Sequence, residues 1–195
     1  MIKISAIIMA SGSSSRMGKN KLFLDYQGIT FLEHIVTLTE KIAFFERILV
    51  ISPENLQGLK LPREVKIIQN TEAAKGQSTS VRLGTKAASG EGYLYLTVDQ
   101  PLLNQALLES LFLAYSKETI AFPVNQLGEP CSPIFFGNTF RSELLKVTGE
   151  SGGRAVRNKH PEAWREIRVK DPECLIDIDT PKEYKQLINQ GFLDT

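Results

Sequence analysis

A loop of small and basic residues is the first stretch of this sequence whose residue types suggest chemistry. Residues 10–21 (ASGSSSRMGKNK) directly follow the apolar run at residues 4–9 (ISAIIM), and they contain Arg16, Lys19 and Lys21 but no acid. Small residues let a backbone approach a polyphosphate and aim its N–H groups at the oxygens. We therefore interpret the stretch as a triphosphate-binding loop rather than a flexible linker. The residues expected to contact the nucleotide are Ala10, Ser11, Gly12, Ser13, Ser14, Ser15, Arg16 and Lys21.

The spacing in this loop argues against the two commonest phosphate-binding motifs. A Walker A loop needs four residues between its glycines and then Lys-Ser or Lys-Thr. Here five residues separate Gly12 from Gly18, and Asn20 stands where the metal-binding hydroxyl should be. The dinucleotide fingerprint also fails, because Ser14 and Met17 replace its second and third glycines.

Alternating strand and helix patterns surround the loop and predict the fold class. Apolar runs without strict alternation predict buried strands, and apolar residues at helical spacing predict helices between them. This order predicts an α/β, Rossmann-like domain over residues 1–195, with a mostly parallel sheet covered by helices on both faces. Strands are expected at residues 4–9, 47–51, 65–68, 93–98 and 119–124, and helices at 30–44, 76–88, 104–115, 140–146, 154–158 and 180–189.

Two local patterns refine this prediction. Thr30 and Glu33 have the spacing of a capping box at the start of the first helix. Residues 124–128 and 131–136 look like two strands joined by a turn that contains Gly128, so a small antiparallel hairpin insertion is expected there.

Composition restricts the classes of function. Lys and Arg number 23 against 22 Asp and Glu, which gives a net charge of +1. Such a balance argues against a protein that coats nucleic acid or an anionic membrane. The apolar run at residues 4–9 is too short to span a membrane and has no basic segment before it. Cys131 and Cys174 are not spaced as metal ligands and are expected to be free thiols, although one disulfide is arithmetically allowed. These features favour a cytoplasmic protein.

The sequence resembles the molybdenum cofactor cytidylyltransferases, within the nucleotidyltransferases that activate cofactor precursors and sugar phosphates. Residues 10–21 match the pattern A-x-G-x-S-x-R-M-G-x-x-K of these enzymes, except that Ser11 stands where they have Ala or Gly. Residues 76–84 (GQSTSVRLG), 96–102 (LTVDQPL), 149–154 (GESGGR) and 177–181 (DIDTP) are similar to further motifs of the family, in the same order. The resemblance covers nearly the whole chain.

This resemblance implies a metal site. It assigns Mg²⁺ to Asp99 at a strand end, with help from Asp177 or Asp179 in the late Asp-x-Asp. The residue types agree, because Mg²⁺ takes one or two carboxylates together with phosphate oxygens and water. Alternatives remain open: Asp99 could cap the helix that follows or form a turn before Pro101, and Asp179 could cap the last helix.

The resemblance also implies the remaining contacts. Gln77, Ser78 and Ser80 are expected near the base or ribose, although Gln77 and Ser78 could simply cap their helix. Ser132 and Arg154 are expected at the acceptor, with a solvated arginine as the alternative for Arg154. The family usually has a G-H-P stretch where this chain has Pro130-Cys131-Ser132-Pro133, and Asp where it has Glu150, so the acceptor is less well defined than the nucleotide.

The implied reaction is transfer of a nucleoside monophosphate, CMP from CTP, to the phosphate of the molybdopterin cofactor, with release of pyrophosphate. Arg16, Lys21 and Asp99 are the expected catalytic residues. Relatives with Gly-Gly in the loop use GTP on the same acceptor, and Ser11 matches neither branch. A sugar- or polyol-phosphate nucleotidyltransferase and a non-catalytic accessory protein that delivers the cofactor remain alternatives. A client molybdenum hydroxylase is the expected partner.

Overall fold

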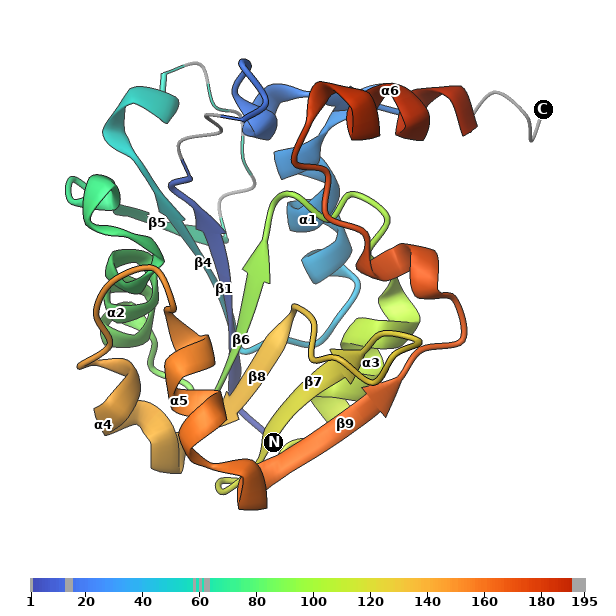
Figure 1. Cartoon of the computed structure of the whole chain (residues 1–195). Coiled ribbons are helices and arrows are strands. Elements are labelled where there is room, and N and C mark those ends of the chain that lie inside the picture. The colour runs from blue at the N-terminus through green and yellow to red at the C-terminus, as the bar shows by residue number, and fades with distance from the viewer. Residues whose placement is uncertain (1, 13–15, 58, 60, 62–63, 191–195) are drawn as a thin grey trace.

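A seven-stranded sheet forms the centre of the molecule, in the order β5-β4-β1-β6-β8-β7-β9 (Figure 1). The computed structural model describes residues 2–12, 16–57, 59, 61 and 64–190. Neighbours among the first four strands run parallel, β8 runs antiparallel to β6 and β7, and β7 and β9 are parallel. The strands are β1 (Ile4–Ala10), β4 (Glu46–Ile51), β5 (Val65–Gln69), β6 (Gly92–Thr97), β7 (Ile120–Val124), β8 (Ile134–Gly137) and β9 (Trp164–Arg168).

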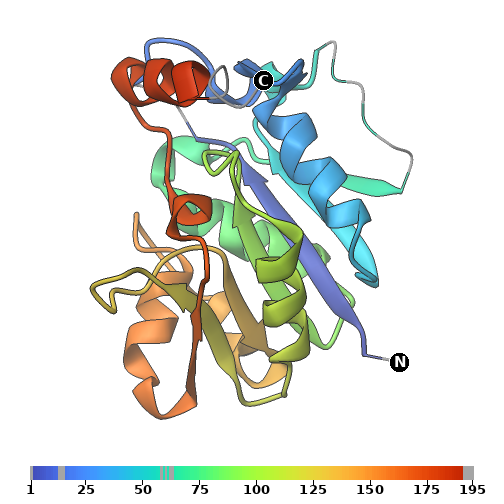
Figure 2. The same ribbon diagram turned by 90° about the vertical axis from the view of Figure 1, so that its right-hand side faces the viewer.

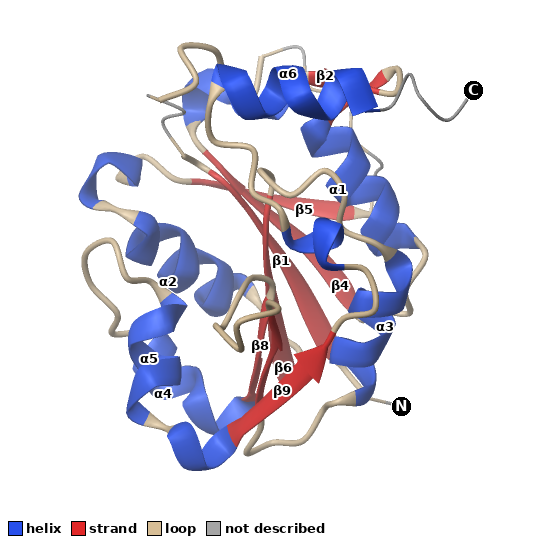
Figure 3. Cartoon of the chain, turned by 45° about the vertical axis from the view of Figure 1, so that its right-hand side comes forward, coloured by secondary structure: helices blue, strands red, loops and turns tan. Residues whose placement is uncertain are grey.

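Helices cover both faces of this sheet, as Figure 3 shows. On one face lie α1 (Phe31–Glu40) and α3 (Gln105–Leu113), which face the viewer in Figure 2. The other face carries α2 (Gln77–Ala87), α4 (Arg141–Leu144) and α5 (Gly153–Lys159). The last helix, α6 (Pro181–Gln190), lies across the end of the molecule to which β1 and β6 point. The predicted fold class is confirmed.

Short 3-10 turns and a two-residue hairpin complete the chain. The hairpin pairs β2 (Asp25–Tyr26) with β3 (Ile29–Thr30) in a separate antiparallel sheet. The 3-10 segments are η1 (Lys21–Phe23), η2 (Pro53–Asn55), η3 (Ala73–Lys75), η4 (Asn138–Phe140), η5 (Pro161–Ala163) and η6 (Pro172–Leu175). No helix in the described ranges is long and apolar enough to cross a membrane.

Two apolar cores, one on each face, hold the helices to the sheet. Successive residues of a strand point to opposite faces, so Ile8 packs in the core that contains α1 while its neighbour Ile7 packs in the core under α2. Ile7 and Ile8 are both fully buried, as expected for a parallel sheet that is covered by helices on both faces. Helix α2 can lie close to β1 because Gly84 has no side chain. A Cβ at this position would overlap Ile7.

Helix starts confirm one local prediction and exclude one alternative role of Asp99. Thr30 Oγ1 accepts from the Glu33 N–H at 3.2 Å, and Glu33 accepts from the Thr30 N–H at 2.8 Å, which is the predicted capping box. Helix α3 is capped by Asn104, whose Oδ1 accepts from the Leu107 N–H at 3.0 Å. Asp99 therefore does not cap α3, and its carboxylate is left for another role.

The third quarter of the chain differs in detail from its prediction. An antiparallel hairpin is present, but its strands are β7 and β8, and residues 125–129 form the turn instead of a strand. Asn125 accounts for the difference, since its Oδ1 accepts from the backbone N–H groups of Leu127 and Glu129, both at 2.9 Å. Strand β9 was not predicted. Its alternating, half-exposed sequence WREIR is typical of an edge strand.

Candidate active site

An open pocket of about 690 Å³ lies at the ends of the strands that surround β1. This is where the strand order reverses from β1-β4 to β1-β6, the usual ligand site of an open α/β sheet. One side, called the α2 end here, is lined by Glu54, Ala73, Ala74 and Ser80. A second part of the lining, the α5 end, is formed by Ser132, Ile134, Gly153 and Arg154. The centre is lined by Ala10, Ser11, Gly12, Arg16, Lys21, Asp99, Asp177 and Asp179.

The loop after β1 contributes most of the centre. The Ser11 hydroxyl donates to the Val50 carbonyl of β4 at 3.2 Å, which anchors the start of the loop. Met17 is buried at 4% exposure in the α1 core and anchors its far half. Between these two anchors Gly12 is exposed. The predicted contacts Ser13, Ser14 and Ser15 lie outside the described residues.

Asn20 has a structural role that sets the position of Lys21. Its Oδ1 accepts from the Leu22 N–H at 3.1 Å and caps η1, and its Nδ2 donates to Asn55 at 2.6 Å. Asn55 in turn donates to the Ser52 hydroxyl at 2.9 Å, so the loop is fixed to the segment after β4. The residue at the position of the Walker hydroxyl therefore orients the next side chain, Lys21, into the pocket.

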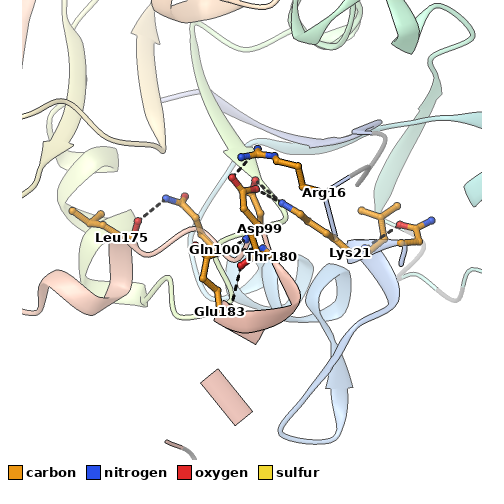
Figure 4. A network of polar contacts seen from close by, with 10 residues as sticks. Arg16, Lys21, Asp99, Gln100, Leu175, Thr180 and Glu183 are labelled. Carbon is orange, nitrogen blue, oxygen red and sulfur yellow. Dashed lines mark hydrogen bonds and ion pairs between the residues drawn. The ribbon is translucent and has the colours of Figure 1, made fainter. Parts of the chain in front are cut away.

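A cluster of opposite charges fills the centre of the pocket (Figure 4). Lys21 Nζ makes an ion pair with Asp179 and lies 3.8 Å from Asp99 Oδ2. Arg16 Nη2 lies 2.8 Å from the second oxygen of Asp179. The two cations differ in accessibility, since the Lys21 side chain is 13% exposed and that of Arg16 is 72% exposed. Residues 158 positions apart thus meet at a single carboxylate.

Backbone contacts bring the late Asp-x-Asp to the end of β6. The Ile178 N–H donates to the Asp99 carbonyl at 2.8 Å, which places Asp177 and Asp179 beside Asp99. The buried Gln100 side chain supports this junction, because its Nε2 lies 3.3 Å from the carbonyls of both Ser132 and Leu175. Glu183 accepts from the N–H groups of Asp179 and Thr180 at 2.8 Å and fixes the start of α6.

The two late aspartates have opposite electrostatic environments. Burial alone would raise the pKa of Asp179, but the hydrogen bond and charge of Lys21, together with Arg16, hold it below its ordinary value. Asp177 borders the open pocket, yet the surrounding protein removes enough water to raise its pKa, and the negative charges of Asp99 and Asp179 act in the same direction. Together these effects raise the pKa of Asp177 to about 7. Three aspartates, Asp99, Asp177 and Asp179, thus lie with only two of the described cations, Lys21 and Arg16, at the centre of the pocket.

This donor set fits a divalent cation that completes its coordination with ligand oxygens. Asp99 Oδ1 is buried and has no hydrogen-bond partner among the described residues, and such an atom is costly unless something else binds it. Within the same ranges, no group of three or more His, Cys, Asp or Glu side chains is arranged to hold a metal by itself. Two carboxylates with phosphate oxygens and water are sufficient for Mg²⁺.

At the α2 end, the structure separates the three residues expected near the nucleoside. Gln77 and Ser80, three positions apart on α2, both line the pocket. Ser78 does not line it; the residue is 1% exposed, its Oγ has no partner within the described chain, and its N–H donates to the Gly149 carbonyl at 3.1 Å. Residues two apart on a helix point to nearly opposite sides, so Ser78 and Ser80 cannot face the same ligand.

The α5 end holds both residues expected at the acceptor. Ser132 and the exposed Arg154 line it, and neither side chain makes a hydrogen bond or ion pair with any described residue. Gly152, with a φ of +50°, precedes α5, and a Cβ there would lie 2.9 Å from Gln77 Oε1. Gln77 therefore packs against the turn that presents Arg154.

Several supporting residues were missed by sequence reasoning. Asn20, Gln100 and Glu183 orient the site, as described above, and Asn70 supports the α2 end. The sequence carried a signal for Glu183, since Thr180 and Glu183 have capping-box spacing. Both cysteines are free in the structure, as expected. Neither histidine lines the pocket: His34 contacts the Tyr26 carbonyl, and His160 contacts Glu143 and Glu162.

Known proteins resemble this chain along most of its length. The purine catabolism protein PucB of Bacillus subtilis is 31% identical over 91% of this chain and 92% of its own. A probable molybdenum cofactor guanylyltransferase of Carboxydothermus hydrogenoformans is 25% identical over 96% of both chains. The molybdenum cofactor cytidylyltransferase of Escherichia coli is 24% identical over 94% of this chain and 95% of its own.

Solved structures agree on the fold, and a family description agrees on the class. Rv0371c of Mycobacterium tuberculosis superposes with a TM-score of 0.83 at 21% identity, over 96% of this chain and 98% of its own. The family model of the MobA-like NTP transferase domain matches residues 6–164, which contain the loop after β1, Asp99 and Arg154. The chain therefore belongs to the MobA-like NTP transferase family and is a nucleotidyltransferase.

Proposed function

We propose that this enzyme transfers CMP from CTP to the phosphate of the molybdopterin cofactor and releases pyrophosphate, with Mg²⁺ as its metal. The observation that carries the proposal is the convergence of Lys21, Arg16, Asp99 and Asp179 at the centre of one pocket. Small or polar residues at the α2 end leave room for a nucleoside. Ser132 and Arg154 at the α5 end, whose side chains have no partner among the described residues, offer polar groups to a phosphate-bearing acceptor.

The residues of the centre suit this reaction because little proton transfer is needed. The acceptor phosphate is already anionic and attacks the α-phosphorus in line, so positioning and charge neutralisation do most of the work. The backbone of residues 10–12 and the side chains of Lys21 and Arg16 bind the phosphates and offset the charge that develops on pyrophosphate. Arg154 orients the acceptor phosphate. Asp99, with Asp177 or Asp179, would hold Mg²⁺, which supplies further charge neutralisation when bound.

Two observations on relatives support the metal and the acceptor. A manganese complex of Rv0371c has been solved, and that protein shares this fold with a TM-score of 0.80 at 20% identity. The relatives from E. coli and C. hydrogenoformans are named for the molybdenum cofactor. A molybdenum hydroxylase is the client that we propose for the dinucleotide product.

The choice of CTP rests on the sequence around Ser11 and Asp99. The loop lacks the Gly-Gly of guanylyl-transferring relatives, and Asp99-Gln100-Pro101 resembles the cytidylyl branch. The Ser11 hydroxyl is occupied by the Val50 carbonyl, so this residue acts on the loop conformation and not as a free donor to the base.

A matrix of substrates tests the proposal. The enzyme is incubated with Mg²⁺, each of the four ribonucleoside triphosphates, and either the molybdopterin cofactor or a sugar phosphate, and pyrophosphate is measured. Release with CTP and the pterin alone supports the proposal. Release with GTP and the pterin would overturn the base assignment, release with a sugar phosphate the acceptor assignment, and nucleotide binding without release the assignment of this reaction.

A further inference from the structure

A buried asparagine below the α2 end is fully committed to hydrogen bonds. Asn70 directly follows β5 in the chain and is 1% exposed. Its Nδ2 donates to Thr79 Oγ1 at 2.9 Å and to Ser80 Oγ at 3.1 Å. Its Oδ1 accepts from the Glu72 N–H at 3.0 Å. A backbone N–H can only donate, so this contact fixes which end of the amide faces the two hydroxyls.

The amide orientation determines the polarity of both hydroxyls. Since Nδ2 carries two hydrogens, Thr79 and Ser80 must each accept one of them. The Thr79 hydroxyl donates a hydrogen bond to the Gly76 carbonyl at 2.8 Å, and Thr79 does not line the pocket. Ser80 lines the pocket, and its hydroxyl hydrogen has no acceptor among the described residues. Ser80 is therefore a donor that is directed by Asn70 and available to a ligand.

We propose that Asn70 is a positioning residue for nucleotide selection, which fixes the Ser80 hydroxyl as a hydrogen-bond donor to N3 of a cytosine base. The inference rests on the proposed nucleotide site and deepens it. Cytosine and uracil both accept at O2, but cytosine has a lone pair on N3 where uracil carries a hydrogen. A donor fixed opposite N3 thus favours cytosine over uracil, because two facing donors leave both hydrogens unsatisfied.

The test uses an isosteric change that reverses polarity. In Asn70→Asp a carboxylate replaces the amide, so the Ser80 hydrogen turns toward residue 70 and only a lone pair faces the pocket. Binding of CTP and UTP analogues with a methylene between the α- and β-phosphates is measured by calorimetry with Mg²⁺ and no acceptor. We expect Asn70→Asp and Ser80→Ala each to weaken binding of the CTP analogue about tenfold, with a much smaller change in the affinity for the UTP analogue.

Thr79→Val is the matched control, because it removes the other hydroxyl that Asn70 contacts but leaves the pocket lining intact. We expect its preference for CTP over UTP to equal that of the unaltered enzyme. Equal loss of preference in Thr79→Val and Ser80→Ala, or an unchanged preference in Ser80→Ala, would overturn the inference. An unchanged preference for CTP in Asn70→Asp, or in Asn70→Ala if the aspartate variant does not fold, would overturn the role of Asn70. Failure of the unaltered enzyme to bind any nucleotide would instead contradict the proposed function.

Discussion

The two sides of the pocket differ in how their polar residues are held. In the half built on β1, β4, β5 and β6, three candidate site residues have partners: Lys21 pairs with Asp179, Ser11 with β4, and Ser80 with Asn70. In the half built on β7, β8 and β9, Ser132 and Arg154 have no described side-chain partner. The proposed nucleotide side therefore contains side chains that are held in place without ligand, whereas the proposed acceptor side presents two side chains without described partners.

This difference has an energetic consequence. A side chain that is already held in place loses little conformational entropy when a ligand binds, so its removal costs most of the interaction. A side chain without a partner must lose rotamer entropy to bind. Substitutions on the nucleotide side should thus lower turnover strongly. Substitutions on the acceptor side should mainly weaken acceptor binding.

Asp99→Asn should have the largest effect on turnover. It keeps the shape of the side chain but removes the charge that the proposed metal needs, so we expect kcat to fall roughly a thousandfold. The fold should persist, because Asp99 Oδ1 has no described partner to lose. Pyrophosphate release at saturating Mg²⁺ measures kcat. Asp171→Asn, at the cap of η6 outside the pocket, is the control. Near-normal turnover of Asp99→Asn would contradict the metal assignment.

Lys21 and Arg16 allow a comparison between two cations that share Asp179. Lys21 is the less exposed, and charges act more strongly where water is excluded. We expect Lys21→Ala to lower kcat roughly a hundredfold or more, and Arg16→Ala roughly tenfold. The measurement is pyrophosphate release at saturating substrates. Equal losses in both variants would show that burial does not set their contributions.

Arg154→Ala tests the acceptor side. Loss of one charge-assisted contact should raise the KM for the acceptor about tenfold and leave the KM for the nucleotide unchanged. Arg82→Ala is a suitable control, because Arg82 donates to the Val147 carbonyl at 2.7 Å and does not line the pocket. A rise in the nucleotide KM of Arg154→Ala would mean that the two sides are not separate.

His160 gives the smallest expected effect, on stability and not on catalysis. Its hydrogen bonds to Glu162 at 3.0 Å and to Glu143 at 2.7 Å raise its pKa in the folded state. The protonated form therefore stabilises the fold below the unfolded pKa of about 6.5, and this contribution is lost as pH rises through the higher folded pKa.

Urea unfolding of the unaltered protein and of His160→Gln at pH 6 and pH 9 measures this contribution. The free energy of unfolding should differ between them by about 1 kcal/mol or less at pH 6, and the difference should shrink at pH 9. A difference that does not change with pH would mean that His160 is not protonated in its pairs.

The same two halves also differ in how far the sequence predicted them. The nucleotide half follows regular strand and helix periods, so β1, the capping box of α1 and the position of α2 were predicted closely. In the acceptor half, the Asn125 turn was interpreted as a strand, and β9 was missed because an edge strand buries little of its surface. Local patterns carry less information where pairing is set by tertiary contacts.

For the site, the sequence indicated the charged residues but not their contacts. Arg16, Lys21, Asp99 and Asp179 were all named, yet nothing in the sequence shows that Lys21 would pair with Asp179 far along the chain. The helical period of 3.6 residues does indicate that Ser78 and Ser80 face apart. The donor polarity of Ser80 required the orientation of the Asn70 amide, which only the structure provides.

The fate of the α-phosphate tests nucleotidyl transfer most directly. Two samples of CTP, one labelled at the α- and one at the γ-phosphate, are incubated with the enzyme, Mg²⁺ and the molybdopterin cofactor. Transfer predicts the α label in the pterin product and the γ label in pyrophosphate, in equal amounts. Label from the γ-phosphate on the acceptor, or α label in free CMP alone, would contradict the proposed reaction.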